Sequence, residues 1–223
     1  MLRDVACILV LALVTASIEQ QAPWSVWLVR PLYWFLQGTL FWAVFVLGHD
    51  CGHGSFSPYG WVNDTFGLVL HSAILVPYAP WKLSHRHHHK NTGNMDKDEI
   101  FYPVRESSPP TPFMLTHGVF GLGLGWFTYL VRGYLPRPVS HLDVWHPFYA
   151  AHFASVALSV TSWCFVAGLL VAAGGMYGWL SVLTWYGIPL FVFASWLVIT
   201  TFLHHNDEHV PWYTNGTWDY VRG

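Results

Sequence analysis

Nine of the 14 histidines in this 223-residue chain fall in three short clusters, at 49–53, 85–89 and 204–209. On a helix, side chains three or four residues apart share one face. Each cluster contains such a group: His49 with His53, His85 with His88 and His89, and His205 with His209. Neutral imidazole suits iron, copper and zinc. Face-matched histidines in three clusters therefore predict a metal site.

Acidic residues beside the clusters could hydrogen-bond the imidazoles from outside the metal shell and orient them. The candidates for this role are Asp50, Asp96, Asp98 and Glu99. Single histidines in an apolar chain are more often core or interface residues, and we give no metal role to the isolated ones. These are His71, His117, His141, His146 and His152.

Apolar segments flank the clusters and must position them. Hydrophobic residues make up 53% of the chain and charged residues 10%, with a mean hydropathy of +0.36. Soluble domains carry about a quarter charged residues, so this composition favours lipid as the surrounding solvent. The formal net charge of −2, without a basic patch, excludes nucleic acid as a partner. Cys7, Cys51 and Cys164 are scattered, which indicates neither a disulfide framework nor a zinc ribbon.

Four apolar segments predict four transmembrane helices in an all-α membrane protein with one domain over 1–223. They cover 5–18, 32–47, 148–173 and 176–203. The first has 14 residues, fewer than the ~20 that span a bilayer. No Asp, Glu, Lys or Arg occurs between Asp143 and Asp207, and only helices suit so long an apolar run in lipid. Gly174 and Gly175 divide this run, so we expect two helical hairpins.

Between the two hairpins, the apolar stretches 61–76 and 113–135 are interrupted by polar residues or glycines and suit helices that lie on the membrane surface. The segment 106–112 contains three prolines and predicts a linker. No convincing cleavage site follows the first apolar segment, which favours a retained helix over a signal peptide.

The distribution of basic residues predicts the orientation. If all four segments cross the membrane, the side that holds 19–31 and 174–175 carries one of the ten Lys and Arg residues, and the other side carries nine. The positive-inside rule makes the second side cytoplasmic, and every histidine cluster lies there. The sequons at Asn63 and Asn215 would also face the cytoplasm and stay unglycosylated.

The sequence around the clusters resembles membrane fatty-acid desaturases, specifically their omega-3, or methyl-end, branch. Residues 49–57 (HDCGHGSFS) resemble the first histidine box of that family, and 85–89 (HRHHH), followed by KNTGN, resemble the second, HxxHH. Further similar segments lie at 75–78, 96–99, 201–205 and 211–213. The resemblance spans essentially the whole chain.

This resemblance implies a four-helix membrane enzyme of the endoplasmic reticulum with a cytoplasmic di-iron site and no flavin or haem. Two electrons from cytochrome b5, or from ferredoxin, would activate O2. The enzyme would then insert a cis double bond toward the methyl end of a fatty acyl lipid or acyl-CoA. The match implies these iron ligands: His49, His53, His85, His88, His89 and His205. His209 is a further candidate, whereas His87 and His204 have no matching role.

The family has a third HxxHH box beyond the position that matches Trp212 and Tyr213, and this sequence contains none. We therefore expect a fragment that is incomplete at the C-terminus, and also at the N-terminus, and inactive alone. A fatty-acyl hydroxylase, an acetylenase or a carotenoid-modifying oxygenase could use the same metal site. A non-catalytic, truncated metal-binding paralogue is a further alternative. A transporter fits less well, because His152 is the main ionisable group within the apolar spans.

Overall fold

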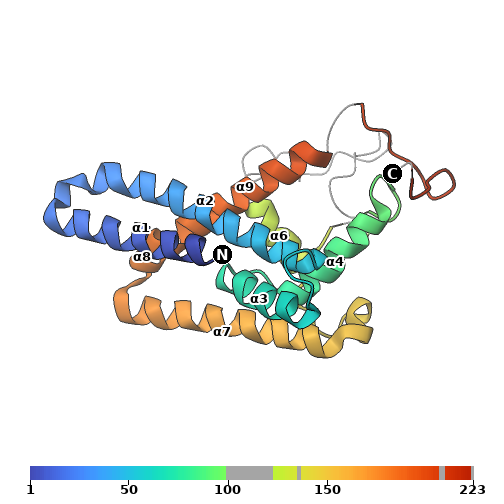
Figure 1. Cartoon of the computed structure of the whole chain (residues 1–223), viewed down its shortest axis with the longest axis horizontal. Coiled ribbons are helices and arrows are strands. Elements are labelled where there is room, and N and C mark those ends of the chain that lie inside the picture. The colour runs from blue at the N-terminus through green and yellow to red at the C-terminus, as the bar shows by residue number, and fades with distance from the viewer. Residues whose placement is uncertain (99–122, 135–136, 206–208, 222–223) are drawn as a thin grey trace.

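The computed structural model describes residues 1–98, 123–134, 137–205 and 209–221, and the regular secondary structure in this part of the chain is all helical, with two isolated β-bridges and no strand (Figure 1). The longer helices are α1 (Leu2–Gln21), α2 (Val26–His53), α3 (Gly60–Ala73), α4 (Tyr78–Asn91), α6 (Leu124–Arg132), α7 (Phe153–Tyr177) and α9 (Ile188–His205). The shorter turns are η1 (Pro23–Ser25), η2 (Pro147–His152), α8 (Trp179–Val182) and the π-helix η3 (Leu183–Gly187).

Three helical stretches of the described residues are long and apolar enough to cross a membrane: Pro23–His53, Pro147–Tyr177 and Trp179–His205. They contain the second and third apolar segments of the sequence and all of the fourth from Trp179 onward. The first segment forms α1, which is helical over 20 residues but is not among the three. In Figure 1, α1 lies antiparallel alongside α2.

The expected break at Gly174 and Gly175 is wrong. Helix α7 continues through both glycines to Tyr177, and the chain turns at Gly178, whose φ of 86° is in the left-handed region that favours glycine. Gly174 serves close packing instead, because a Cβ there would lie 2.6 Å from the Trp179 ring. Glycine occurs at 174, 175 and 178, and the packing of the folded chain determines which of them forms the turn.

The pair α2 and α9 forms the centre of the molecule. Gly38 allows their close approach, because a Cβ at this position would lie 2.5 Å from the Val192 Cβ. The π-helix before α9 leaves carbonyls without their usual helical donors. Two side chains of α2 supply donors: Tyr33 Oη donates to Trp185 O at 2.9 Å, and Trp34 Nε1 donates to Thr184 O at 2.7 Å.

Helices α3 and α4 lie between α2 and α7 (Figure 1). Helix α3 covers most of the expected 61–76 but ends at Ala73, because Leu75 takes a φ of 54° in the turn to α4. Helix α6 lies within the expected 113–135. The rest of that stretch before Gly123 and the expected linker at 106–112 lie outside the described residues.

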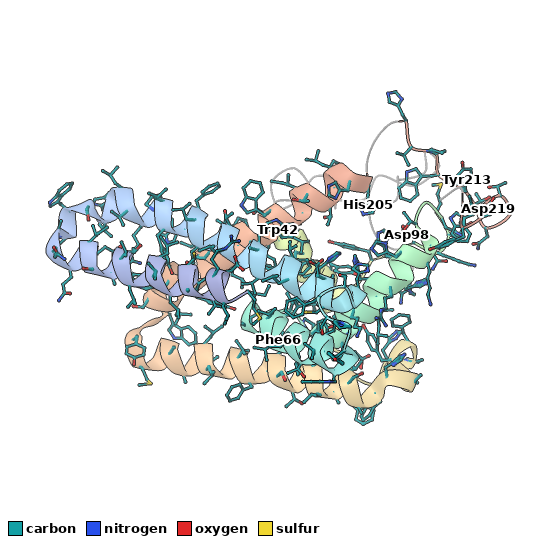
Figure 2. All side chains as sticks on the ribbon, viewed as in Figure 1. Trp42, Phe66, Asp98, His205, Tyr213 and Asp219 are labelled. Carbon is teal, nitrogen blue, oxygen red and sulfur yellow. The ribbon has the colours of Figure 1, made fainter. Side chains whose placement is uncertain are left out.

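An aromatic core beneath the end of α2 sets the position of the histidines. Phe45 is 4% exposed, and its ring lies 4.8 to 5.7 Å from five others, those of Trp42, His71, Trp81, Trp126 and Phe193. Trp42 and Phe66, labelled in Figure 2, pack against the same core from α2 and α3. Since His49 follows Phe45 by one helical turn, this core fixes where the first histidine cluster begins.

Candidate metal centre

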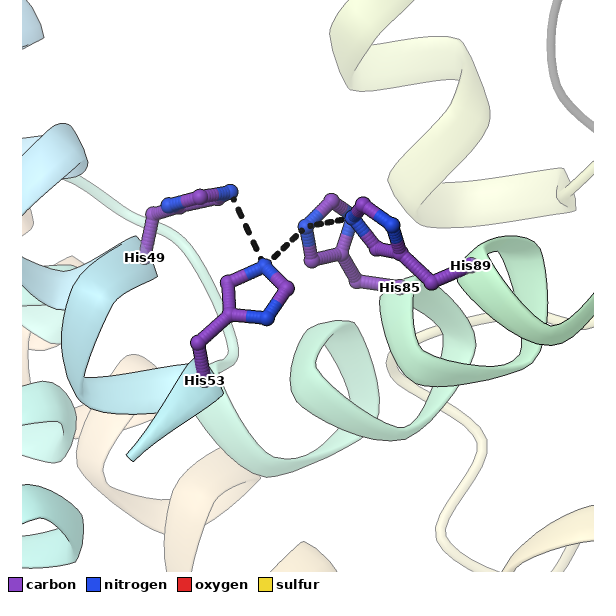
Figure 3. Close-up of side chains that lie close together, drawn as sticks. All are labelled: His49, His53, His85 and His89. Atoms are coloured by element: carbon purple, nitrogen blue, oxygen red, sulfur yellow. Dashed lines mark hydrogen bonds between the residues drawn. The ribbon is translucent and has the colours of Figure 1, made fainter. Parts of the chain in front are cut away.

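Four histidines from two helices converge on one point. His49 and His53 lie on the last turns of α2, and His85 and His89 lie on α4 (Figure 3). One ring nitrogen of each lies within 4.8 Å of the others. Consecutive Nε2 atoms are 3.2 Å apart from His49 to His53, 3.0 Å from His53 to His85 and 3.1 Å from His85 to His89. Nitrogens bound at about 2.1 Å to one metal, at right angles, lie about 3 Å apart, so the spacing fits a shared ion.

Two contacts fix the end of α2 relative to α4. Gly54 ends α2 with a φ of 77°, a left-handed C-terminal cap. The Arg86 side chain reaches from α4 and donates to the Gly52 carbonyl at 3.1 Å. Gly52 also passes the Trp81 ring so closely that a Cβ there would lie 3.0 Å from it. These contacts hold the two histidine-bearing turns in register.

The environment keeps His85 and His89 neutral, which is the form of imidazole that binds a metal. Burial, followed by the neighbouring histidines, holds the pKa of His85 far below its usual range. The same causes lower the pKa of His89 to about 4. His53 and His89 are exposed while His49 and His85 are half-buried, so the cluster opens to one side.

His88 belongs to a second group beside the first. Its ring is 2% exposed, and its Nδ1 lies 2.8 Å from Oδ1 of Asp98, which is fully buried. A carboxylate at Nδ1 holds the proton there and leaves Nε2 for a metal. The His88 ring also lies 4.7 Å from that of His205, at the end of α9 (Figure 2 labels His205 and Asp98). His88 and His205 thus form a second pair of histidines beside the four-histidine group.

The structure places the other candidates differently. Asp50 lies with Oδ1 3.3 Å from Nδ1 of His49, as expected for an orienting carboxylate. Asp96 contacts the backbone N–H of Asn215 through Oδ2 at 2.8 Å. His209 is exposed and is not a member of the four-histidine group. Glu99 lies outside the described residues.

The histidines without an expected metal role lie away from the four-histidine group where the structure describes them. His71 and His141 are buried in the protein, at 0% and 1% exposure. His87 points from α4 toward Phe148, with 6.0 Å between the rings. His204, His146 and His152 lie outside the group, and His117 is outside the described residues.

Two residues that pack or bond beside the four-histidine group were missed in the sequence: Trp81 and Arg86. Trp81 had a usable signal, because it precedes His85 by four residues and must share its helical face. Arg86 lies within the second cluster, but its partner is a carbonyl 34 residues away. No local pattern reveals a contact of this kind.

The donor set fits a transition metal. It consists of imidazole nitrogens with a carboxylate behind one of them, and it suits iron, copper and zinc. A sequence model for the fatty acid desaturase family matches residues 25–222. The chain belongs to the fatty acid desaturase family. The expected family is therefore confirmed.

Curated relatives agree with this assignment. A "probable fatty acid desaturase DES1" of Sorghum bicolor is 41% identical over 99% of the chain and 57% of its own length. The "acyl-lipid omega-3 desaturase (cytochrome b5), endoplasmic reticulum" of Arabidopsis thaliana is 40% identical, over 99% and 58%. An "sn-1 acyl-lipid omega-3 desaturase (ferredoxin)" of Nostoc sp. (strain 36) is 42% identical, over 88% and 56%. The chain thus spans little more than half the length of these relatives.

Proposed function

We propose that this chain forms the iron-binding core of an O2-dependent fatty acyl desaturase. The observation that carries the proposal is the convergence of the four-histidine group, beside the buried pair of His88 and Asp98. The proposed ligands are His49, His53, His85, His88, His89 and His205. The four-histidine group would hold one ion, and His88 with His205 would supply part of the shell of the second.

When bound, two irons would supply the chemistry by which O2, two electrons and two protons take two hydrogens from adjacent methylenes, leaving a cis double bond and two molecules of water. The chain's own residues prepare the centre for this reaction. Asp98 keeps the proton of His88 on Nδ1, and burial keeps His85 neutral. The aromatic core of Phe45 and Trp81 closes the centre from below and excludes water from that side.

The substrate and the electron donor are part of the proposal. The names of the relatives describe acyl-lipid omega-3 desaturation, with cytochrome b5 for one protein and ferredoxin for another. These names support a double bond toward the methyl end of a fatty acyl lipid, and an acyl-CoA is the alternative carrier in our proposal. They support cytochrome b5 in the endoplasmic reticulum as the donor, with ferredoxin as the alternative.

We further propose that α1 also crosses the membrane, which gives four spans with the histidines on the cytoplasmic side. At about 1.5 Å per residue a 20-residue helix is about 30 Å long, the thickness of the hydrocarbon core. The turns that join α1 to α2 and α7 to α8 lie at the same end in Figure 1, far from α4. They expose Trp24, Trp27, Tyr177 and Trp179. Tryptophan and tyrosine favour the membrane–water interface, which supports this end as the opposite boundary.

Iron binding and product formation test the proposal separately. The 223-residue chain, purified in detergent micelles without oxygen, should bind iron, and substitution of both His49 and His85 by alanine should remove the iron held by the four-histidine group. A chain that binds no iron would contradict the metal site. His146→Ala is a matched control, because His146 lies outside the four-histidine group.

Product formation can be measured in yeast that express the protein together with cytochrome b5. Gas chromatography of the fatty acids should show a new double bond toward the methyl end. A hydroxylated product would instead support the related hydroxylases.

A further inference from the structure

Asn94 shapes the loop that carries Asp98 away from α4. Its side chain is fully buried, and Oδ1 accepts hydrogen bonds from the N–H groups of Asp96 at 2.9 Å and Lys97 at 3.2 Å. Its own carbonyl accepts from the N–H of Asp98 at 2.9 Å. A buried asparagine that bonds the backbone two and three residues ahead forms a tight local turn. The position of Asp98 therefore depends on Asn94.

A segment more than 100 residues later in the chain forms hydrogen bonds with this loop. Tyr213 donates its N–H to the Gly93 carbonyl at 2.9 Å and accepts at its own carbonyl from the N–H of Met95 at 2.9 Å. The Trp218 indole donates to the Thr92 carbonyl at 2.9 Å. Figure 2 shows Tyr213 and Asp219 beyond the end of α4, on the side where Asp98 lies.

Two asparagine side chains join the segments. Asn94 Nδ2 donates to Asn215 Oδ1 at 3.1 Å, across 121 residues of sequence. Asn215 returns its backbone N–H to Oδ2 of Asp96 at 2.8 Å. Each segment thus contributes a donor and an acceptor. The loop cannot shift without breaking bonds to the later segment.

We propose that Asn94 and Asn215 form a latch, and that this latch positions Asp98 against His88. The carboxylate of Asp98 and the ring of His88 are both buried and meet at 2.8 Å. A carboxylate at this distance orients the imidazole and fixes its tautomer. The latch therefore acts on His88 indirectly, through the loop and the Asp98 carboxylate that the loop carries, so Asn94 and Asn215 are positioning residues. Its effect on iron rests on the proposed function, whereas its effect on the loop does not.

The simplest other role of Asn215 is in glycosylation, because Asn215, Gly216 and Thr217 form a sequon. Thr217→Val separates the two roles. It destroys the sequon and the hydroxyl contacts with Thr214, but it leaves both partners of Asn215 in place. Asn215→Asp also destroys the sequon, yet it keeps an oxygen that can accept from Asn94.

Hydrogen exchange of the iron-free chain in detergent tests the latch itself. In Asn215→Ala, the N–H groups of Met95 and Asp98 should exchange about fivefold to tenfold faster, as expected for loss of one hydrogen bond. Asn215→Asp and Thr217→Val should stay within about twofold of the unsubstituted chain. Unchanged exchange in Asn215→Ala, or equal acceleration in Thr217→Val, would overturn the latch. This measurement involves no metal, so it fails or succeeds independently of the proposed function.

Iron affinity, measured by competition with a chelator, tests the consequence at His88. Loss of a hydrogen-bond partner behind a metal ligand lowers affinity by about 10- to 100-fold. We expect Asn94→Ala and Asn215→Ala to lower the affinity for the weaker iron by an amount approaching this range. Asn215→Asp should restore that affinity. The double alanine variant should bind no worse than Asn94→Ala alone, because both changes break the same bond. Additive losses, or loosened exchange with unchanged affinity, would overturn the link to His88.

Discussion

The indole ring of Trp81 stacks on the imidazole of His85, with 4.6 Å between the ring centroids and 19° between the planes. Trp81 is 4% exposed, and it also packs edge-on against His71 at 4.8 Å. It therefore links a proposed ligand to the aromatic core. Since the indole precedes His85 by one helical turn, it limits the rotation of that imidazole.

Trp81→Ala should lower both the stability and the iron affinity of the chain. Removal of a buried tryptophan costs about 3–5 kcal/mol, and His85 would lose the surface that orients it. Trp81→Phe keeps an aromatic face and should retain most of the iron affinity. Thermal unfolding of the iron-free chain and chelator competition measure the two effects. Trp145→Ala is the control, because Trp145 is 79% exposed, and its effect should be within about 0.5 kcal/mol.

Asp98→Asn should weaken one of the two irons by about 10- to 100-fold, because the amide removes the charge that orients His88. The four-histidine group does not include Asp98, so the other iron should remain bound. Chelator titration with two resolved affinities makes the comparison. Asp219→Asn changes an exposed carboxylate at the same end of the molecule (Figure 2), and this variant should bind iron as before. If Asp98→Asn bound both irons as tightly as the unsubstituted chain, Asp98 would have no role at the metal.

Helical spacing predicts much of the centre but not its division into two groups. The sequence correctly places His49 and His53 on one face, because α2 continues past its apolar residues to His53. Adjacent residues on a helix are about 100° apart. His89 therefore turns toward His53, while its neighbour His88 turns toward Asp98 and His205. Which face meets which partner depends on how α2, α4 and α9 pack.

Contacts between distant segments were beyond prediction. The bond from Asn94 to Asn215 has no periodic signal, and both residues are typical of ordinary turns. The turn at Gly178 was misplaced for a related reason. The sequence pattern predicted the turn at Gly174 and Gly175, but both lie inside α7, and the Trp179 ring packs on Gly174.

Buried His141 should make stability depend on pH. Burial, followed by the nearby Arg137, lowers its pKa to about 3, against about 6.5 for an exposed histidine. Above pH 6.5 the imidazole is neutral in both states. Below pH 6.5, this imidazole binds a proton in the unfolded chain but stays neutral in the folded chain. The stability therefore falls as the pH drops from about 6.5 toward about 3.

His141→Phe keeps a ring beside Tyr129, which lies 4.6 Å from the imidazole, and removes this dependence. Between pH 8 and pH 5 the unsubstituted chain should lose about 2 kcal/mol more than the variant. Unfolding of the iron-free protein in denaturant at the two pH values measures the difference. Parallel losses in the two proteins would show that His141 does not stay neutral in the fold.

Gly48→Ala should disrupt the four-histidine group indirectly. Within that group, Gly48 is next only to His49, its neighbour in sequence. A Cβ at Gly48 would overlap the His71 ring, which is fully buried and bonded through Nε2 to the Phe45 carbonyl at 3.1 Å. Overpacking a core of this kind costs about 1–3 kcal/mol. Because Phe45 and His49 are one turn apart, the displacement should also weaken iron binding.

Gly175→Ala is the matched control, since Gly175 is also inside a helix but a Cβ there meets nothing within 4 Å. Alanine is favoured over glycine in a helix by about 0.5–1 kcal/mol, so this variant should be slightly more stable and bind iron normally. Thermal unfolding and iron content of the two variants, purified side by side, provide the comparison. If Gly48→Ala matched Gly175→Ala in both, the close contact of α2 with His71 would have no part in holding the centre.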